Sequence, residues 1–179
     1  ALQSKDYYLA RQFYSKLFEV VEEQPGGDMA LWGLGLATYL SGDQDWGVIY
    51  LNKAALEYPA TEGGGRAALK LVDHEIQRGG EMGMVQASVA YAQLGKQAAN
   101  WRVREEATFK HALSLYLIGD HAESVDVLMN FAREFSSSHL IREARILLIE
   151  QIPLVVNRLL EEKNELDAVV LVEKNRKLL

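Results

Sequence analysis

The chain has 179 residues and a net charge of −6, and 49% of its residues are hydrophobic. This content supports a buried core in one domain or one repeat array, and the acidic balance argues against binding a nucleic-acid backbone, which needs clustered Lys and Arg. The lack of cysteine excludes disulfides and thiolate metal sites, and no apolar run reaches the roughly 18 residues that a membrane-spanning helix needs.

Residues 1–61 predict helices separated by clear turns. Only three prolines occur in the chain, which favours helix. Residues 1–4 are expected to end one helix, and residues 7–24 to form the next. Residues 31–41 and 43–59 predict two short helices around Gly42, with Asp43 as the N-cap. Because the chain begins without Met, we expect it to be a fragment of a longer protein.

The rest of the chain predicts further helix pairs. The glycine-rich residues 62–65 predict a loop, and Gly79-Gly80 a turn between helices at 66–78 and 82–94. Residues 97–118 are expected to form a helix with a break near 98–100, paired with a helix at 120–135 that Asp120 caps. Residues 139–163 predict a helix kinked at Pro153, and residues 165–178 a final helix.

An internal repeat becomes visible when the chain is shifted by 77 residues against itself. Residues 31–61 then align without a gap with residues 108–138, and nine positions are identical. The identical positions include the turn pairs Gly42-Asp43 and Gly119-Asp120 and several apolar helix positions. Half of this offset is about 38 residues, which is typical of a helix-pair repeat and places a further pair between the two copies.

Residues 31–59 resemble a tetratricopeptide (TPR) repeat, a helix–turn–helix unit of 34 residues. The positions that match its pattern are Leu31, Leu34, Gly35, Gly42, Gly47, Leu51, Ala54 and Pro59. Thr38 departs from it, since Tyr39 stands one position late. The later copy keeps Ala112, Gly119, Ser124 and Leu128, but has His111, Phe131 and Ser136 at pattern positions.

The resemblance implies an all-α solenoid, in which antiparallel helix pairs stack in a right-handed superhelix of about 4 to 5 pairs. The expected pairs cover residues 1–25, 29–59, 66–96, 99–135 and 138–178 in a single domain, 1–179. The segments 57–61 and 134–138 also resemble linkers of bacterial cell-envelope TPR proteins. The compartment therefore stays open between the cytoplasm and a bacterial periplasm or envelope.

Side chains that could carry chemistry form no catalytic pattern. The four histidines make no H-x-x-x-H pair, and Glu105-Glu106 do not face each other on a helix. The serines at 136–138 lack a nucleophile-elbow context, and residues 62–66 lack the Lys-Ser/Thr of a phosphate loop. We therefore expect no enzyme activity, no metal and no cofactor.

The resemblance places a partner-binding groove on the first helix of each pair. The groove positions are Met29, Trp32, Leu36 and Tyr39, and on the later copy Glu106, Phe109, Leu113 and Tyr116. Exposed Trp and Tyr recur at binding hot spots. The carboxylate clamp of some family members is not reproduced, because Met29, Trp32 and Leu36 stand at its positions. An equally open interpretation is that these aromatics pack between repeats.

These features favour a non-catalytic scaffold that binds a peptide or helix of a partner protein, within a larger protein or assembly. The alternative is an all-α sensor or enzyme domain that binds a small molecule between repeats. It requires Tyr39, His74, His111 and Tyr116 to converge on one cavity. Self-association through the chain ends is a further possibility, because Leu178 and Leu179 leave an apolar terminus.

Overall fold

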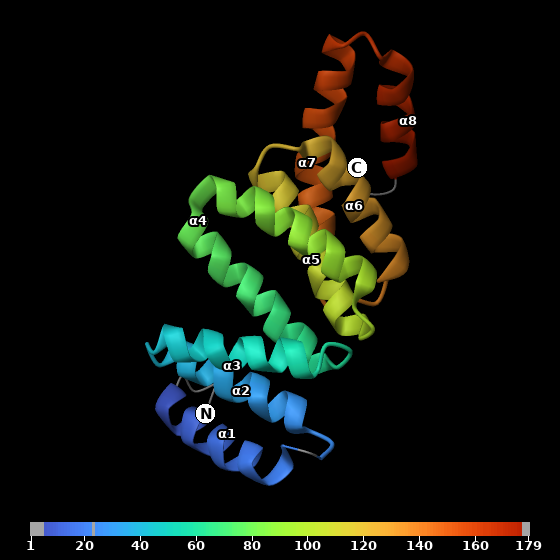
Figure 1. The fold of residues 1–179 in the computed structure, drawn as a ribbon. Helices are drawn as coiled ribbons and strands as arrows, with labels where there is room; N and C mark the ends of the chain where they lie inside the picture. Colours follow the sequence, from blue (N-terminus) through green and yellow to red (C-terminus); the bar gives the residue numbers. More distant parts are fainter. Residues whose placement is uncertain (1–5, 23, 177–179) are drawn as a thin grey trace.

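A computed structural model describes residues 6–22 and 24–176, with the backbone alone at 80–82. The described residues form helices and no strand, in agreement with the predicted all-α class (Figure 1). The helices are α1 (Tyr7–Val21), α2 (Gly27–Leu40), α3 (Gln44–Glu57), α4 (Glu62–Gln97), α5 (Trp101–Leu117), α6 (His121–Glu134), α7 (Ile141–Glu161) and α8 (Glu165–Asn175). Residues 1–4 and Leu178-Leu179, to which predictions were attached, lie outside the described residues.

Helices that follow one another in the chain pack against one another, and α2 also contacts α4. The core is accordingly divided into clusters that each join neighbouring helices. One cluster joins Leu31, Leu51 and Ala67 of α2, α3 and α4. Another joins Leu69 and Tyr91 of α4 to Val103 of α5. The third cluster spans α5, α6 and α7 and contains Ala112, Val125, Leu128, Phe131, Phe135, Ala144, Leu148, Ile152 and Val155.

The turns after α2 and α5 depend on glycine. Gly42 has φ 101° and Gly119 has φ 84°, a left-handed conformation that strains any residue with a side chain. The carboxylate of Asp120 then accepts the backbone N–H of Glu123 at 3.3 Å, as predicted. The predicted side-chain cap by Asp43 is wrong: its carboxylate instead lies 3.4 Å from Arg11 of α1.

The predicted loop at residues 62–65 is wrong, because α4 begins at Glu62 and includes all three glycines. Thr61 caps it by accepting the N–H of Gly64 at 3.2 Å, and Asp28 of α2 accepts the N–H of Gly63 at 3.0 Å. A Cβ at Gly64 would collide with the carbonyl of Tyr58. The glycines therefore let the start of α4 lie directly against its neighbours, and they do not make it a loop.

The second half of α4 folds back along the first half. In a straight helix, residues 18 positions apart are separated by about 27 Å. Yet the hydroxyl of Tyr91 donates a hydrogen bond to the carboxylate of Asp73, and Gly83 lies against the backbone of Glu75 and Ile76. Figure 1 shows α4 changing direction near its middle. Residues 66–78 thus contact residues 82–94, but the predicted turn at 79–80 is wrong, because the helical backbone of α4 continues through it.

Two further sequence features of the helices can be compared with the structure. The break near residues 98–100 is confirmed, because Asn100 caps α5 by accepting the N–H groups of Arg102 and Val103 at 3.0 and 3.3 Å. Pro153 lies inside α7, which continues on both sides of it. Within the described residues, no helix has both the length and the apolar character needed to cross a membrane.

Gly64→Ala is expected to lower the free energy of unfolding by about 1–3 kcal/mol, the usual cost of overpacking a tight contact. Gly79→Ala is the matched control, because its Cβ would meet no atom within 4 Å. It should be neutral or stabilising by up to about 1 kcal/mol, since Ala favours helix over Gly. Urea unfolding followed by circular dichroism measures both, and equal effects would contradict this account of the glycine-rich stretch.

Candidate functional site

The predicted groove residues of α2 differ in their exposure. The side chain of Met29 is 36% exposed, and Trp32 and Leu36 are half-buried. The guanidinium of Arg66, on α4, lies 5.3 Å from the centroid of the Trp32 ring. An arginine over a tryptophan face is a favourable cation–π arrangement, and it fixes the orientation of the indole.

A cavity of about 160 Å³ lies where α2, the first half of α4 and α5 meet, and we call it the α2–α4–α5 cavity. Its wall combines apolar and charged side chains. The lining residues are Trp32, Leu36, Arg66, Leu69, Lys70, Asp73, Glu106 and Lys110. The fold-back of α4 positions this wall, because it fixes the face that carries Arg66, Lys70 and Asp73 between α2 and α5.

Most charges at this cavity are paired with one another. Arg66 lies 2.9 Å from Glu62, and Lys110 lies 2.9 Å from Asp73 and 3.3 Å from Glu106. The side chains of Asp73 and Lys110 are only 30% and 24% exposed, so their pairing is screened less than that of a surface pair. Asp73 also accepts the hydroxyl of Tyr91, and burial, followed by this hydrogen bond, raises the pKa of that phenol.

Tyr39, expected on the groove surface, is buried with 5% of its surface exposed. Its hydroxyl donates to Oε1 of Gln77 at 2.9 Å and lies 2.9 Å from Nδ1 of His74. Burial, with a smaller contribution from the charge of Asp73, raises the pKa of Tyr39. Tyr39 thus packs between helices, as the second interpretation of the aromatic residues expects. Its side chain leaves almost no exposed surface for a partner.

Of the groove residues predicted on α5, Glu106 lines this cavity, whereas the other three lie apart from its wall. Phe109, Leu113 and Tyr116 are half-buried. The ring of Phe109 packs against Phe131 of α6 at a centroid distance of 5.9 Å, and Tyr116 lies 5.6 Å from the ring of His121. Phe109 and Tyr116 thus contact α6, and the structure does not bring the eight predicted groove positions into one site.

The four side chains required by the small-molecule alternative fall into separate contacts. Tyr39 contacts His74, whereas Nδ1 of His111 lies 3.1 Å from the hydroxyl of Ser88, and Tyr116 packs on His121. In the part of the chain that the structure describes, no three His, Asp or Glu side chains gather as a metal site requires.

Four of the five charged residues at the cavity, namely Arg66, Lys70, Asp73 and Lys110, were not among the predicted groove positions. Arg66, Lys70 and Asp73 follow an i, i+4, i+7 spacing that places them on one helix face, and Glu106 and Lys110 are separated by one turn. This signal was present in the sequence. Arg66, Lys70 and Asp73 lie in the helix predicted at 66–78, but the groove positions implied by the TPR resemblance cover residues 29–39 and 106–116 alone.

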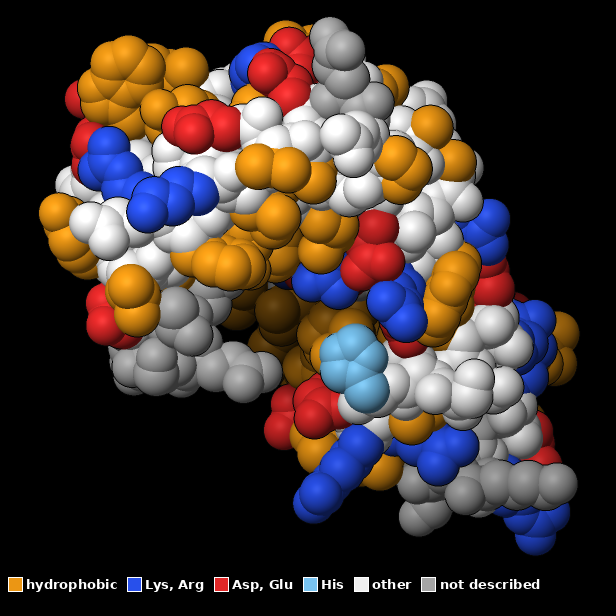
Figure 2. All heavy atoms as spheres, turned by 90° about the horizontal axis from the view of Figure 1, so that it is seen from below, with side chains coloured by type: hydrophobic (Ala, Val, Ile, Leu, Met, Phe, Trp, Pro, Cys, Tyr) orange, Lys and Arg blue, Asp and Glu red, His pale blue; other side chains and the backbone are white. Residues whose placement is uncertain are grey.

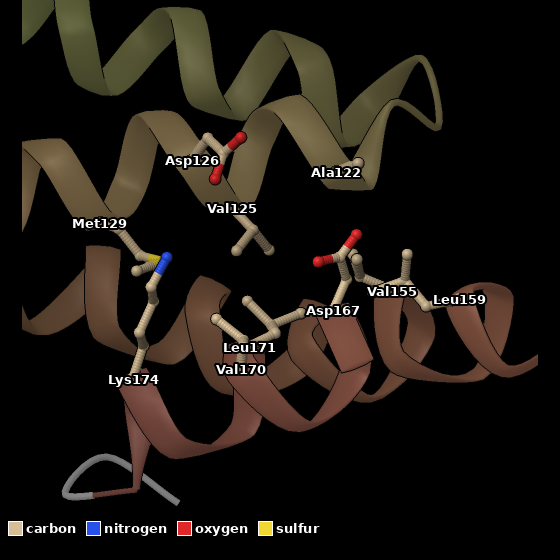
Figure 3. Close-up of a pocket in the computed structure, with 10 residues that line it drawn as sticks. All are labelled: Ala122, Val125, Asp126, Met129, Val155, Leu159, Asp167, Val170, Leu171 and Lys174. Carbon is tan, nitrogen blue, oxygen red and sulfur yellow. The ribbon is translucent and has the colours of Figure 1, made fainter. Parts of the chain in front are cut away.

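Further hollows lie outside this region, and two of them are as follows. A groove of about 390 Å³ between the second half of α4, α5 and the start of α6 contains Lys96, His111 and Glu123. A cavity of about 270 Å³ lies between α6, α7 and α8 (Figure 3). In Figure 3, Val125, Leu171 and Val155 lie around the space, with Asp126, Asp167 and Lys174 around them. It is a gap in the packing of the last two helices.

Apolar surface is not confined to these hollows. Seen from below, hydrophobic side chains gather around a hollow, and Lys and Arg side chains lie beside it (Figure 2). The exposed side chains of Leu9, Phe13 and Val20 give α1 an apolar stripe. Unpaired apolar surface of this kind is typical of proteins that contact other macromolecules.

The comparisons leave the family of the chain undetermined. No protein-family model, no curated protein and no solved structure matches the sequence or the fold. The functional argument therefore depends on the residues and contacts described above.

Tyr39→Phe is expected to lower the free energy of unfolding by about 1–3 kcal/mol, because it removes the buried hydroxyl that Gln77 and His74 contact. Tyr8→Phe, at a tyrosine that is 68% exposed, should change it by less than about 0.5 kcal/mol. Urea unfolding measures both variants. If Tyr39→Phe were as stable as the wild type, the hydroxyl would not support the fold as described.

The stability of the chain should fall as the pH decreases below about 6.5, the ordinary pKa of histidine. Burial lowers the pKa of His111 in the folded state; Glu123 partly offsets this and Lys96 adds to it. The unfolded state therefore binds more protons on acidification. Urea unfolding at pH 7.5 and 5.5 should show a smaller loss for His111→Gln than for the wild type, and equal losses would contradict the role of His111.

Proposed function

We propose that the chain is a TPR-like, non-catalytic scaffold that binds a segment of a partner protein in an inner groove at α2, α4 and α5. In this proposal the helix pairs stack in a right-handed superhelix, within a larger protein or assembly. The packing of consecutive helices, the contact of α2 with α4 and the repeated turns at Gly42 and Gly119 support it.

The single observation that carries the proposal is the position of Trp32. It is half-buried at the α2–α4–α5 cavity, and Arg66 lies over its ring. Trp and Arg are the residue types most enriched at binding hot spots, and a partly enclosed apolar wall is the setting in which they contribute most. A partner side chain that enters this cavity would bury Trp32 and Leu36 further, since Leu69 is already buried.

The size of the cavity favours a protein partner over a small molecule. Small-molecule sites have volumes of about 300–1,000 Å³, whereas this cavity has about 160 Å³. It therefore suits one bulky side chain of a larger partner. The separation of Tyr39 and His74 from His111 and Tyr116 also weakens the sensor or enzyme alternative.

Self-association through the chain ends stays a prediction. The apolar stripe of α1 and the exposed Ile146, Ile149 and Leu160 of α7 are consistent with it. Leu178 and Leu179, on which it was first based, lie outside the described residues. It concerns the ends of the helix array and is independent of the groove.

Affinity capture from a native cell extract tests the groove. Trp32→Ala should weaken the affinity for the specific partner by at least about 30-fold, the equivalent of a hot spot of about 2 kcal/mol, and the captured amount of that partner should fall accordingly. Trp46→Ala is the matched control, because it removes a tryptophan that is 53% exposed on α3 and away from the cavity wall. Quantitative mass spectrometry compares the captured proteins.

Since Trp32 is half-buried, circular dichroism must first show that Trp32→Ala is folded. If it is not, Met29→Glu, one helical turn away and more exposed, takes its place with the same expected loss. Equal retention of every captured protein by the wild type and the folded groove variant would contradict the proposal.

A further inference from the structure

The α2–α4–α5 cavity contains one cation that has no carboxylate partner among the described residues. Arg66 and Lys110 each have a carboxylate within 4.0 Å, whereas Lys70 has none. The ammonium of Lys70 instead lies 4.4 Å from the centroid of the buried Tyr39 ring. This cation–π contact holds Lys70 at the cavity wall without neutralising its charge.

The charges at the cavity are distributed unevenly. Lys110 has two carboxylates within 4.0 Å, Asp73 and Glu106, and Arg66 has Glu62, just outside the wall. Lys70 therefore offers its positive charge to a partner more readily than the other two cations do. Trp32 and Leu36 provide apolar surface within the same wall.

We propose that the groove recognises an acidic amphipathic segment of the partner, in which a bulky apolar side chain enters the cavity and a neighbouring carboxylate pairs with Lys70. This inference rests on the proposed scaffold function and specifies the chemistry of its partner. On a helical segment the two side chains would be three or four positions apart, since that spacing places them on one face.

In this proposal, Lys70 determines which partner segments bind more than the buried area of the interface does. A partner with a neutral or basic residue at this position would cover a half-buried ammonium without compensating it, which is a desolvation penalty. A carboxylate removes that penalty and forms a charge-assisted hydrogen bond. Arg66 and Lys110 are neutralised within the chain, so the site presents one cation and not the cluster that a polyanion such as RNA requires.

Selection from a phage-displayed library of random 16-residue peptides on the full chain tests this inference. The wild type should enrich peptides in which Asp or Glu stands three or four positions from Leu, Ile, Met, Phe or Trp. Lys70→Glu should fail to enrich them. Lys16→Glu, at an exposed lysine on α1, makes the same change in net charge and should enrich them as the wild type does.

A double-mutant cycle on the best synthetic peptide gives the decisive comparison. Replacing its acidic residue by the amide should weaken binding to the wild type at least tenfold, as isothermal titration calorimetry measures it. The same replacement should have less than a twofold effect on Lys70→Gln, since the carboxylate has lost its partner. Circular dichroism confirms that each variant is folded.

The outcomes separate this inference from the proposed function. If Trp32→Ala weakens binding of the selected peptides but substitution of Lys70 does not, the groove proposal stands and the inference of an acidic partner is wrong. If neither substitution weakens binding of the selected peptides, the groove proposal fails as well. The inference would be overturned if the wild type enriched peptides without acidic residues. It would also be overturned if the wild type enriched no peptide more strongly than Lys70→Glu does.

Discussion

The carboxylate of Asp73 joins three helical segments. It accepts the hydroxyl of Tyr91 from the second half of α4 and the ammonium of Lys110 from α5, at 2.9 Å. It therefore ties the fold-back of α4 to the next helix. Because the groups are partly buried, removal of one partner would leave a charge that is poorly compensated. The α2–α4–α5 cavity exists only while these segments stay together, since Asp73 and Lys110 both line it.

Close backbone approach is the second constraint on this region. Gly63 and Gly64 allow the start of α4 to lie against Asp28 and Tyr58, and Gly47 allows α3 to lie against Tyr39 of α2. Glycine in a helix costs about 0.5–1 kcal/mol relative to Ala. Here the cost is offset by the packing that the missing side chain permits, so a glycine-rich helix forms where the composition favours a loop.

Features that depend on local sequence could be predicted. Gly42 and Gly119 mark turns because their left-handed backbone conformation strains residues that have a side chain. The capping of α6 by Asp120 and the break before α5 also follow from nearby residues. The two copies of the 77-residue repeat correspond to α2 with α3 and to α5 with α6, and in each copy the two helices pack together.

Features that depend on distant contacts could not be predicted. The helical state of residues 62–65 requires the carboxylate of Asp28, and the burial of Tyr39 requires His74 and Gln77. Likewise, only the ion pairs of the folded chain show that Arg66 and Lys110 have carboxylate partners whereas Lys70 has none among the described side chains. Of the predicted groove residues, Trp32, Leu36 and Glu106 line the cavity, whereas the prediction did not include Arg66, Lys70, Asp73 and Lys110.

The fold-back of α4 is the central claim, because it places the charged wall of the groove. Two nitroxide labels at Ala68→Cys and Ala90→Cys would test it directly, since the chain has no native cysteine. Packed helices lie 8–10 Å apart, so electron paramagnetic resonance should report a separation far below about 33 Å, the length of this segment in a straight helix. A distance near about 33 Å would show that α4 is straight, and would contradict both the fold and the proposed groove.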